Sequence, residues 1–283
     1  MTPGTAERTR PASPADRPAG PSRSVRAGVP WPLAVPAAIA AAFLLLPLAG
    51  LLVRAPWRSM PSLLGDPLVR EALRLSLLSA TLATAVSLVI GVPLAWVLAR
   101  ARFRGLSVLR ALVTLPLVLP PVVGGVALLL ALGRRGIVGR WLDAWFGIQI
   151  PFTTTAVVIA ETFVALPFLV VTVEGALRSA DPRLEEASAS LGADRWTTFR
   201  RVTLPTIAPS LLAGSVLCWA RALGEFGATI TFAGNFPGRT QTMPIAVYLA
   251  LETDPDAAIA LSLVLLAVSV AVLVSLRDRV LRR

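Results

Sequence analysis

The chain has 283 residues, of which 55% are hydrophobic and only 15% are charged, and its formal net charge is +11. Soluble globular domains are usually less apolar and more charged, so this composition indicates a membrane protein. A basic balance can indicate a nucleic-acid partner, but here long apolar runs separate the charges, which argues against one. No histidine is present, which excludes imidazole catalysis and His-ligated zinc, and the single cysteine, Cys218, excludes an intrachain disulfide. We therefore expect no metal site and no catalytic residue.

The N-terminal part combines a polar tail with the first apolar segment. Residues 1–30 are rich in Pro, Ser, Ala and Arg and contain few large apolar residues, so they are predicted to form a disordered tail. The apolar run that follows is longer than the core of a signal peptide, and no small-residue cleavage pattern follows it. We expect an uncleaved membrane span at about residues 33–53.

Five further apolar runs reach the length of about 20 residues that crosses a bilayer. The predicted fold class is therefore an all-α integral membrane protein with six transmembrane helices, formed by one domain over residues 31–283. Glycines and prolines inside several runs fit either kinked helices beside a cavity or close helix packing. The five runs lie at about 73–99, 108–132, 154–174, 207–232 and 257–276.

Arginine placement predicts the orientation of these spans. All 27 basic residues are arginines, and 18 of them lie in the tail, in the second and fourth connections and after the last span. The positive-inside rule then places both termini in the cytoplasm. The basic balance is thus a topological signal that also favours contact with anionic lipid headgroups.

The fourth connection, residues 175–206, is longer than the others and has the composition of structured chain. Asp181 and Pro182 are typical of a helix start, and Gly192 is placed to end that helix. Asp194 is expected to cap a second short helix, Arg195 to Val202, which Leu204-Pro205 would close. The sequence predicts two short helices on the cytoplasmic side, and an ordinary interfacial segment is the alternative.

These residues also carry a family resemblance. Glu186-Ala187-Ser188, then Gly192 after three residues, then Val202 after nine more and Leu204-Pro205 resemble the EAA signature of binding-protein-dependent ABC importer permeases. Two positions depart mildly from that signature, with Ser188 in place of alanine and Val202 in place of isoleucine. The resemblance implies the type I importer permease fold, with residues 182–195 as the coupling helix that docks on a separate ATPase.

The same resemblance defines the expected partners. No G-x-x-x-x-G-K-[ST] motif occurs in the chain, so ATP is expected to be used by the partner ATPase and no cofactor is bound directly. One coupling segment per chain implies a homodimer on an ATPase pair. The ATPase-docking residues implied are Leu184, Glu185, Glu186, Ala187, Ser188, Leu191, Gly192, Ala193 and Trp196.

A second resemblance concerns the substrate. The stretch Arg221–Asn235 and its continuation to Tyr248 closely resemble molybdate permeases of this family, as do residues 133–136 and 147–152. The resemblance implies import of molybdate from an extracytoplasmic binding protein into a bacterial cell by alternating access. Sulfate and tungstate permeases share the Gly-Glu-Phe-Gly core and remain alternatives, and a secondary anion transporter is an alternative of another class.

Arg221 and Glu225 are ionisable residues four positions apart, within the fifth predicted span. Such groups are costly inside a membrane and usually form pairs. Arg221 either helps an oxyanion to pass or closes a gate through Glu225, or it forms a fixed ion pair, within the helix or between helices, that supports the bundle. Glu161, in the fourth span, is an alternative partner for Arg221.

Small and hydroxyl residues nearby are further candidates for the substrate pathway, because hydroxyls can hydrogen-bond a tetrahedral oxyanion weakly enough to release it. The same residues also fit simple helix packing. The substrate pathway candidates are Arg221, Gly224, Glu225, Gly227, Thr229 and Thr231. Asn235, Arg239 and Thr240 are expected on an outer lip that faces the binding protein.

An amphipathic segment is predicted between the third and fourth spans. Trp141, Leu142, Trp145 and Phe146 recur at helical spacing. Aromatic residues in such a pattern are typical of a helix at the membrane surface. We expect an interfacial helix on the outer face with no part in transport.

Overall fold

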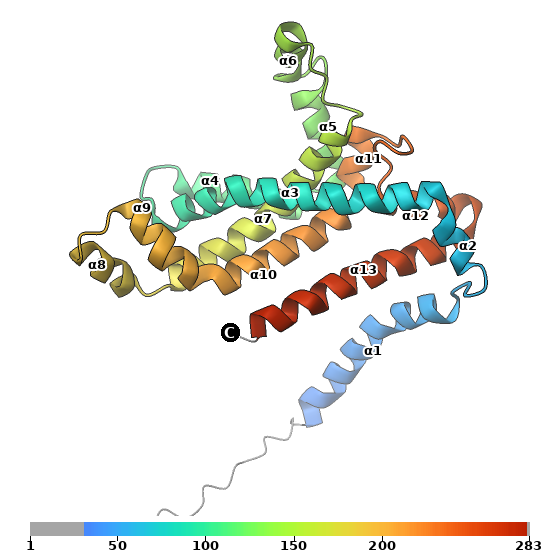
Figure 1. Cartoon of the computed structure of the whole chain (residues 1–283), viewed down its shortest axis with the longest axis horizontal. Helices are drawn as coiled ribbons and strands as arrows, with labels where there is room; N and C mark the ends of the chain where they lie inside the picture. Colours follow the sequence, from blue (N-terminus) through green and yellow to red (C-terminus); the bar gives the residue numbers. More distant parts are fainter. Residues whose placement is uncertain (1–30, 282–283) are drawn as a thin grey trace, which may run out of the picture. The chain divides into compact units, whose positions relative to one another are not determined.

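The computed structural model describes residues 31–281, and this part of the chain consists of helices, turns and loops without a strand (Figure 1). The all-α fold class is thus confirmed, while the predicted tail at residues 1–30 lies outside the described residues. The helices are α1 (Trp31–Val53), α2 (Met60–Gly65), α3 (Pro67–Arg100), α4 (Leu106–Val118), α5 (Pro121–Leu132), α6 (Gly139–Phe146), α7 (Thr154–Ser179), α8 (Pro182–Ser190), α9 (Arg195–Thr198), α10 (Leu204–Leu223), α11 (Gly227–Ala233), α12 (Met243–Thr253) and α13 (Pro255–Leu281), with a π turn at Phe199–Thr203.

The chain divides into two compact units, one up to Ala49 and one from Gly50 onward. The first unit contains most of α1, an apolar helix of 23 residues with Pro36 and Pro47 inside it and no buried side chain. Its length and composition suit a membrane span, as predicted.

The second unit is a helical bundle built around α7, which packs against α3, α4, α5, α10 and α11. Small side chains allow close approach at its centre, where Ala80 and Ala83 of α3 and Ala165 of α7 are fully buried. Gly91 of α3 lies so close to α7 that an added Cβ would be 2.8 Å from Leu166 Cδ1. In a membrane such contacts, rather than exclusion of water, hold helices together.

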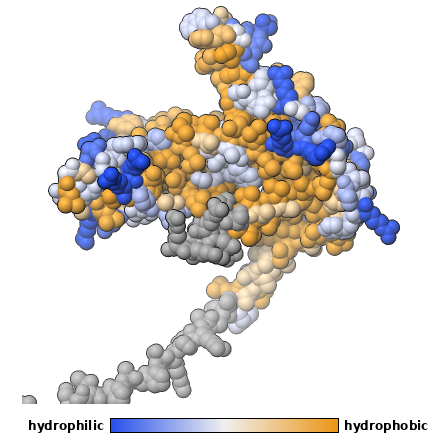
Figure 2. Space-filling model, in the orientation of Figure 1, coloured by the Kyte–Doolittle hydropathy of each residue, from blue (hydrophilic) through white to orange (hydrophobic). Residues whose placement is uncertain are grey.

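Hydrophobic residues cover the length of the bundle, and hydrophilic residues gather towards its ends (Figure 2). Within the described residues, five helical stretches are long and apolar enough to cross a membrane. They include α3, α7 and the first part of α13, which agree with the predicted second, fourth and sixth spans apart from their exact ends.

The third predicted span, 108–132, is not a single helix. α4 ends at Val118 and α5 starts at Pro121, and the two residues between them, Leu119 and Pro120, are extended. The reason is the Pro120-Pro121 pair, because proline lacks the N–H that a helix requires and disfavours helical geometry in the preceding residue. The predicted span therefore consists of two helices, interrupted at prolines that the sequence places inside it.

The fifth predicted span, 207–232, is broken as well. α10 ends at Leu223, residues 224–226 leave the helix, and α11 begins at Gly227. α11 packs into a second cluster in which Ala228 and Phe232 are fully buried against Val157 and Ala160 of α7. The short helix therefore belongs to the core of the bundle.

The predicted interfacial helix is confirmed as a helix by α6, which ends at Gly147 in a left-handed conformation. Trp141 and Trp145 lie on one side of it, with ring centroids 5.2 Å apart, and both are exposed. α6 follows α5 at the end where α5 projects from the bundle (Figure 1).

The packing of α5 on α11 yields a first prediction. A Cβ at Gly125 would overlap Thr231 Oγ1 and lie 2.7 Å from the Ala228 carbonyl oxygen. We expect Gly125→Val to lower the free energy of unfolding by about 1–3 kcal/mol or more, because a packed interface has no room for the side chain. Thermal unfolding of the purified protein in detergent measures the change.

Gly175→Ala is the matched control for this experiment. Nothing lies within 4 Å of the Cβ that this change would add, and Gly175 is inside α7. Alanine is the better helix former, so the control should keep or slightly raise stability. Equal unfolding temperatures for Gly125→Val and wild type would contradict the described packing.

Candidate functional site

The segment that resembles the EAA signature forms a distinct element at one end of the bundle (Figure 1). We call residues 181–203 the α8–α9 element. Asp181 starts it by accepting a hydrogen bond from the Arg183 N–H at 3.0 Å, and Asp194 caps α9 by accepting from the Thr197 N–H at 3.3 Å. Hydrogen bonds from Thr197, chiefly from its side chain, lower the pKa of Asp194, so the cap is held ionised.

Gly192 joins the two helices of this element. Its φ is +83°, a conformation that residues with a Cβ rarely adopt, and the space around it is open. The predicted end of the first helix at this glycine is confirmed, and so are the two helix starts at Pro182 and Arg195.

The second helix of the element does not end at Leu204-Pro205, so that prediction is wrong. The chain passes through the π turn Phe199–Thr203 into α10 without a break. Leu204 donates to the Phe199 carbonyl, five residues earlier, and this wider turn accommodates Pro205, which would disrupt a regular α-helix. The α8–α9 element is therefore continuous with a membrane-spanning helix.

The structure places the predicted docking residues in two groups. One group is half-buried on the inner side of the element and consists of Glu185, Ser188 and Ala193. The other group is exposed and includes large apolar side chains, such as Leu191, which is 89% exposed, and Trp196, which is 66% exposed. The exposed group consists of Leu184, Glu186, Ala187, Leu191, Gly192 and Trp196.

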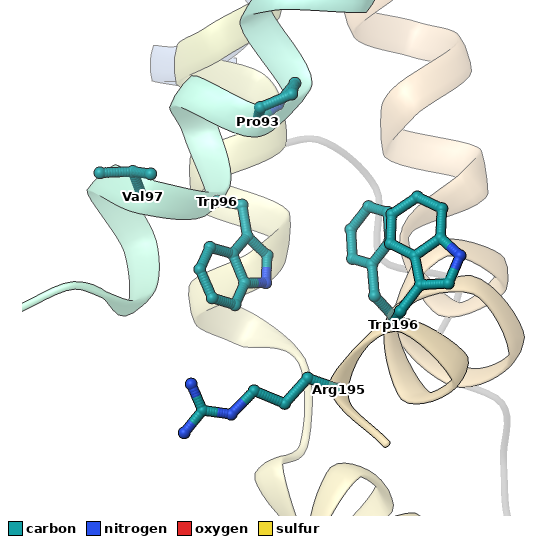
Figure 3. A pocket seen from close by; sticks show the side chains of 6 residues that line it. Pro93, Trp96, Val97, Arg195 and Trp196 are labelled. Carbon is teal, nitrogen blue, oxygen red and sulfur yellow. The ribbon is translucent and has the colours of Figure 1, made fainter. Parts of the chain in front are cut away.

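Trp196 faces a hollow between α9 and the end of α3. It stacks on Phe199, with ring centroids 5.7 Å apart, and both residues line a cavity of about 390 Å³. Figure 3 shows Trp96 of α3 and Trp196 on opposite sides of this cavity, with Arg195 extending below Trp96 in this view. The α8–α9 element is thus not packed tightly onto α3 here.

Ion pairs at this end of the bundle were not predicted from the sequence. Arg100 Nη2 lies 2.8 Å from Glu185 Oε1, and the Glu174 carboxylate pairs with Arg110 at 3.0 Å and with Arg178 at 2.9 Å. From the sequence, these arginines indicated only the orientation of the spans. Their spacing predicts an interaction only for Glu174 and Arg178, which are four residues apart on one helix.

The break between α10 and α11 contains the ionisable pair predicted in the fifth span. Arg221 Nη1 lies 2.6 Å from Glu225 Oε2, and Glu225 Oε1 accepts a hydrogen bond from the Ala228 N–H at 2.9 Å. Glu225 is 1% exposed, and a buried charge needs compensation. The Arg221 guanidinium and the first turn of α11 provide it. Arg221 pairs with Glu225, whereas Glu161 accepts from the Ser79 hydroxyl at 2.8 Å.

The remaining pathway candidates differ in their access to the surface. Gly224 is exposed and lines a cavity of about 390 Å³ with residues of α12 and α13. Gly227 is buried against Pro121 and Val122, and Thr229 is fully buried. The Thr231 hydroxyl donates to the Gly227 carbonyl at 2.8 Å. Among the six candidates, Gly224 is exposed in this conformation, Arg221 and Thr231 are half-buried, and Glu225, Gly227 and Thr229 are buried.

The predicted outer lip is a compact loop after α11. Gly234 and Gly238 have positive φ values of 75° and 70°, and the buried Thr240 hydroxyl accepts from the Phe236 N–H at 2.9 Å. Asn235 is half-buried and Arg239 is exposed. Of the three predicted lip residues, Arg239 is therefore the one that a partner can reach most readily.

The loop around α6 is held by a polar cluster at the surface. Asp143 accepts hydrogen bonds from Gln149 Nε2 and Arg134 Nε, both at 3.0 Å. These bonds, first that of Gln149 and then that of Arg134, lower the pKa of Asp143. The cluster joins the turn before α6 to the segment after it.

Comparison with known proteins identifies the family. Residues 87–283 match the family described as binding-protein-dependent transport system inner membrane component, and the chain belongs to this family. It is thus a multi-pass membrane protein and the permease component of an ABC importer, which removes the secondary transporter as an alternative.

Individual relatives narrow the comparison further. The molybdenum transport system permease protein of Mycobacterium tuberculosis is 50% identical over 79% of this chain and 84% of its own. The corresponding protein of Escherichia coli K12 is 45% identical over 65% of this chain and 80% of its own. The sulfate transport system permease protein of the same strain is 38% identical over 82% of this chain and 84% of its own.

Solved structures support the fold. A bacterial alginate ABC transporter in complex with its periplasmic protein matches with a TM-score of 0.71 at 18% identity, over 87% of this chain and 91% of that chain. An inward-facing methionine ABC transporter matches with a TM-score of 0.56 at 19% identity, over 75% and 92%. The predicted importer permease fold is confirmed by these similarities.

The Arg221–Glu225 pair yields a second prediction. Arg221→Ala leaves a buried carboxylate without its cation, and we expect it to lower the free energy of unfolding by about 2–4 kcal/mol. Adding Glu225→Ala removes that charge, so the double variant should be more stable than the sum of the two single changes implies. A double-mutant cycle of thermal unfolding should give a coupling energy of at least about 1 kcal/mol.

Transport by the double variant separates the two interpretations of this pair. If the double variant regains the stability lost in Arg221→Ala and takes up substrate normally, the pair has a structural role only. Recovered stability without uptake assigns Arg221 or Glu225 to the pathway. Strictly additive effects of the two single changes would contradict the ion pair itself.

Proposed function

We propose that this chain is the permease subunit of an ATP-driven importer that moves molybdate from a solute-binding protein into the cytoplasm. The observation that carries the proposal is its 50% identity to a molybdenum permease over 79% of the chain, against 38% to a sulfate permease over a similar length.

The permease itself carries out no chemistry in this proposal. A separate pair of ATPase subunits binds and hydrolyses ATP and engages the α8–α9 element. The exposed Leu184, Glu186 and Leu191 supply apolar contact and a charge for that docking. Because the element continues into α10, displacement of the element by the ATPase is passed to a spanning helix.

The assembled transporter would contain two copies of this chain. One α8–α9 element engages one ATPase of a pair, so a homodimer is required for both ATPases to be used. Closure of the ATPases on ATP then opens the permease towards the loaded binding protein, and hydrolysis restores the inward-facing form. In this arrangement both termini and the α8–α9 element are cytoplasmic, and Arg239 on the opposite lip faces the binding protein.

The substrate pathway would run past the break between α10 and α11. Gly224 and Arg221 border accessible space there, and the partly accessible Thr231 lies on the adjacent turn of α11. Glu225 is too deeply buried to contact a dianion and serves to hold Arg221 and α11 in place. Gly227 and Thr229 join the pathway only when the packing of α11 changes during the cycle.

Substrate choice provides a third prediction. In proteoliposomes that contain this chain, its ATPase and its binding protein, labelled molybdate should be taken up when ATP is present. Unlabelled tungstate, a tetrahedral dianion of similar size, should compete well, and the smaller sulfate should compete poorly. Preferred uptake of labelled sulfate would instead assign the chain to the sulfate permeases.

Docking of the ATPase provides a fourth prediction. Glu186→Lys reverses a charge on the exposed face of α8, so we expect the recovery of ATPase with the purified permease to fall about tenfold or more. Glu252→Lys makes the same change at an exposed position at the end of α12 and should leave recovery unchanged. Equal recovery with both variants would show that α8 is not the docking surface.

A further inference from the structure

The α8–α9 element has a second side, which faces the bundle. α8 packs mainly against α9 and the π turn. Between the element and α3 lie the cavity of Figure 3 and a neighbouring cavity of about 370 Å³, which is lined by Trp96, Arg100, Glu185 and Thr203, among others. Close apolar packing therefore does not fix α8 to α3.

One carboxylate bridges this hollow. Glu185 Oε1 accepts from Arg100 Nη2 at 2.8 Å and from the Thr203 hydroxyl at 2.9 Å. Arg100 is the last residue of α3, and Thr203, which is 3% exposed, is the last residue of the π turn that leads into α10. A single side chain of α8 thus holds the ends of two spanning helices.

The environment strengthens these contacts. The side chains of Arg100 and Glu185 are only 25% and 30% exposed, so the pair is partly shielded from water. Hydrogen bonds to a charged group are stronger than those between neutral groups, and partial burial increases that strength. A small displacement of α8 would therefore pull on α3 and α10 together.

We propose that Glu185 is a positioning residue that couples the α8–α9 element to α3 and α10, through Arg100 and Thr203, rather than a residue that contacts the ATPase. The proposal rests on the function proposed above. It divides the EAA-like segment between two tasks, with Glu186 directed outward for docking and Glu185 directed inward for transmission.

The test uses the full chain assembled with its ATPase and binding protein in proteoliposomes. In Glu185→Gln the ATPase should be recovered as in wild type and ATP should still be hydrolysed. Oxyanion uptake per ATP hydrolysed should fall about tenfold, the factor expected when a charge-assisted contact is lost. Arg100→Gln should behave alike, and Arg100→Lys should retain much of the coupling.

Arg102→Gln is the matched control, because it removes the same charge two residues away at an exposed position with no described ion pair. It should keep the wild-type ratio of uptake to hydrolysis. The double variant Arg100→Gln, Glu185→Gln should have a ratio of uptake to hydrolysis no lower than that of either single variant, since the two residues act as a unit. If Glu185→Gln proves too unstable to purify, Thr203→Val tests the other half of the bridge.

Two outcomes overturn the proposal. An uptake-to-ATP ratio in Glu185→Gln equal to that of Arg102→Gln would show that the bridge transmits nothing. Loss of the ATPase on purification would show that Glu185 belongs to the docking surface. Failure of the proposed function would appear differently, as an absence of molybdate uptake by the wild-type complex.

Discussion

The bundle is organised by the close packing of α3 and α10 on α7. Helices in a membrane gain little from exclusion of water, so they associate where small side chains let their surfaces meet. Ala80 and Ala83 of α3 and Ala165 of α7 belong to one buried cluster, and a Cβ at Gly214 of α10 would lie 3.1 Å from Thr172 Cβ of α7. With α3, α7 and α10 held together, the ends of the bundle present defined positions for polar and functional groups.

The interruptions of the helices depend on this same frame. A chain in an apolar environment must satisfy its backbone groups, so a broken helix is tolerated only where other groups take their place. At the α10–α11 break, the Glu225 carboxylate accepts from the Ala228 N–H and is balanced by Arg221. At the α4–α5 break, Pro121 has no N–H to satisfy, and α5 then packs against α11. Both breaks thus lead to the same region of the bundle.

The α8–α9 element is connected to two spanning helices. It is joined to α10 through the π turn, and it is tied to α3 by one carboxylate across a hollow. Leu184 and Leu191 of this element remain exposed, at 48% and 89%. Continuity with α10 and the polar bridge to α3 are thus two separate connections of the element to the bundle.

The sequence by itself determined the helical class, the membrane character, the positions of the unbroken spans, the capped starts at Pro182 and Arg195, and the family, because these depend on local composition and spacing. It also brought Arg221 and Glu225 together, since residues four apart on a helix meet. It did not reveal that α9 runs through the π turn into α10, that Glu225 leaves the helix to cap α11, or that Thr240 is buried. These features follow from the packing of the bundle, as do the inward direction of Glu185 and the outward direction of Glu186. The reason is physical: which groups satisfy a broken helix or a buried charge depends on neighbours distant in the sequence, such as Arg100 for Glu185 and Ser79 for Glu161.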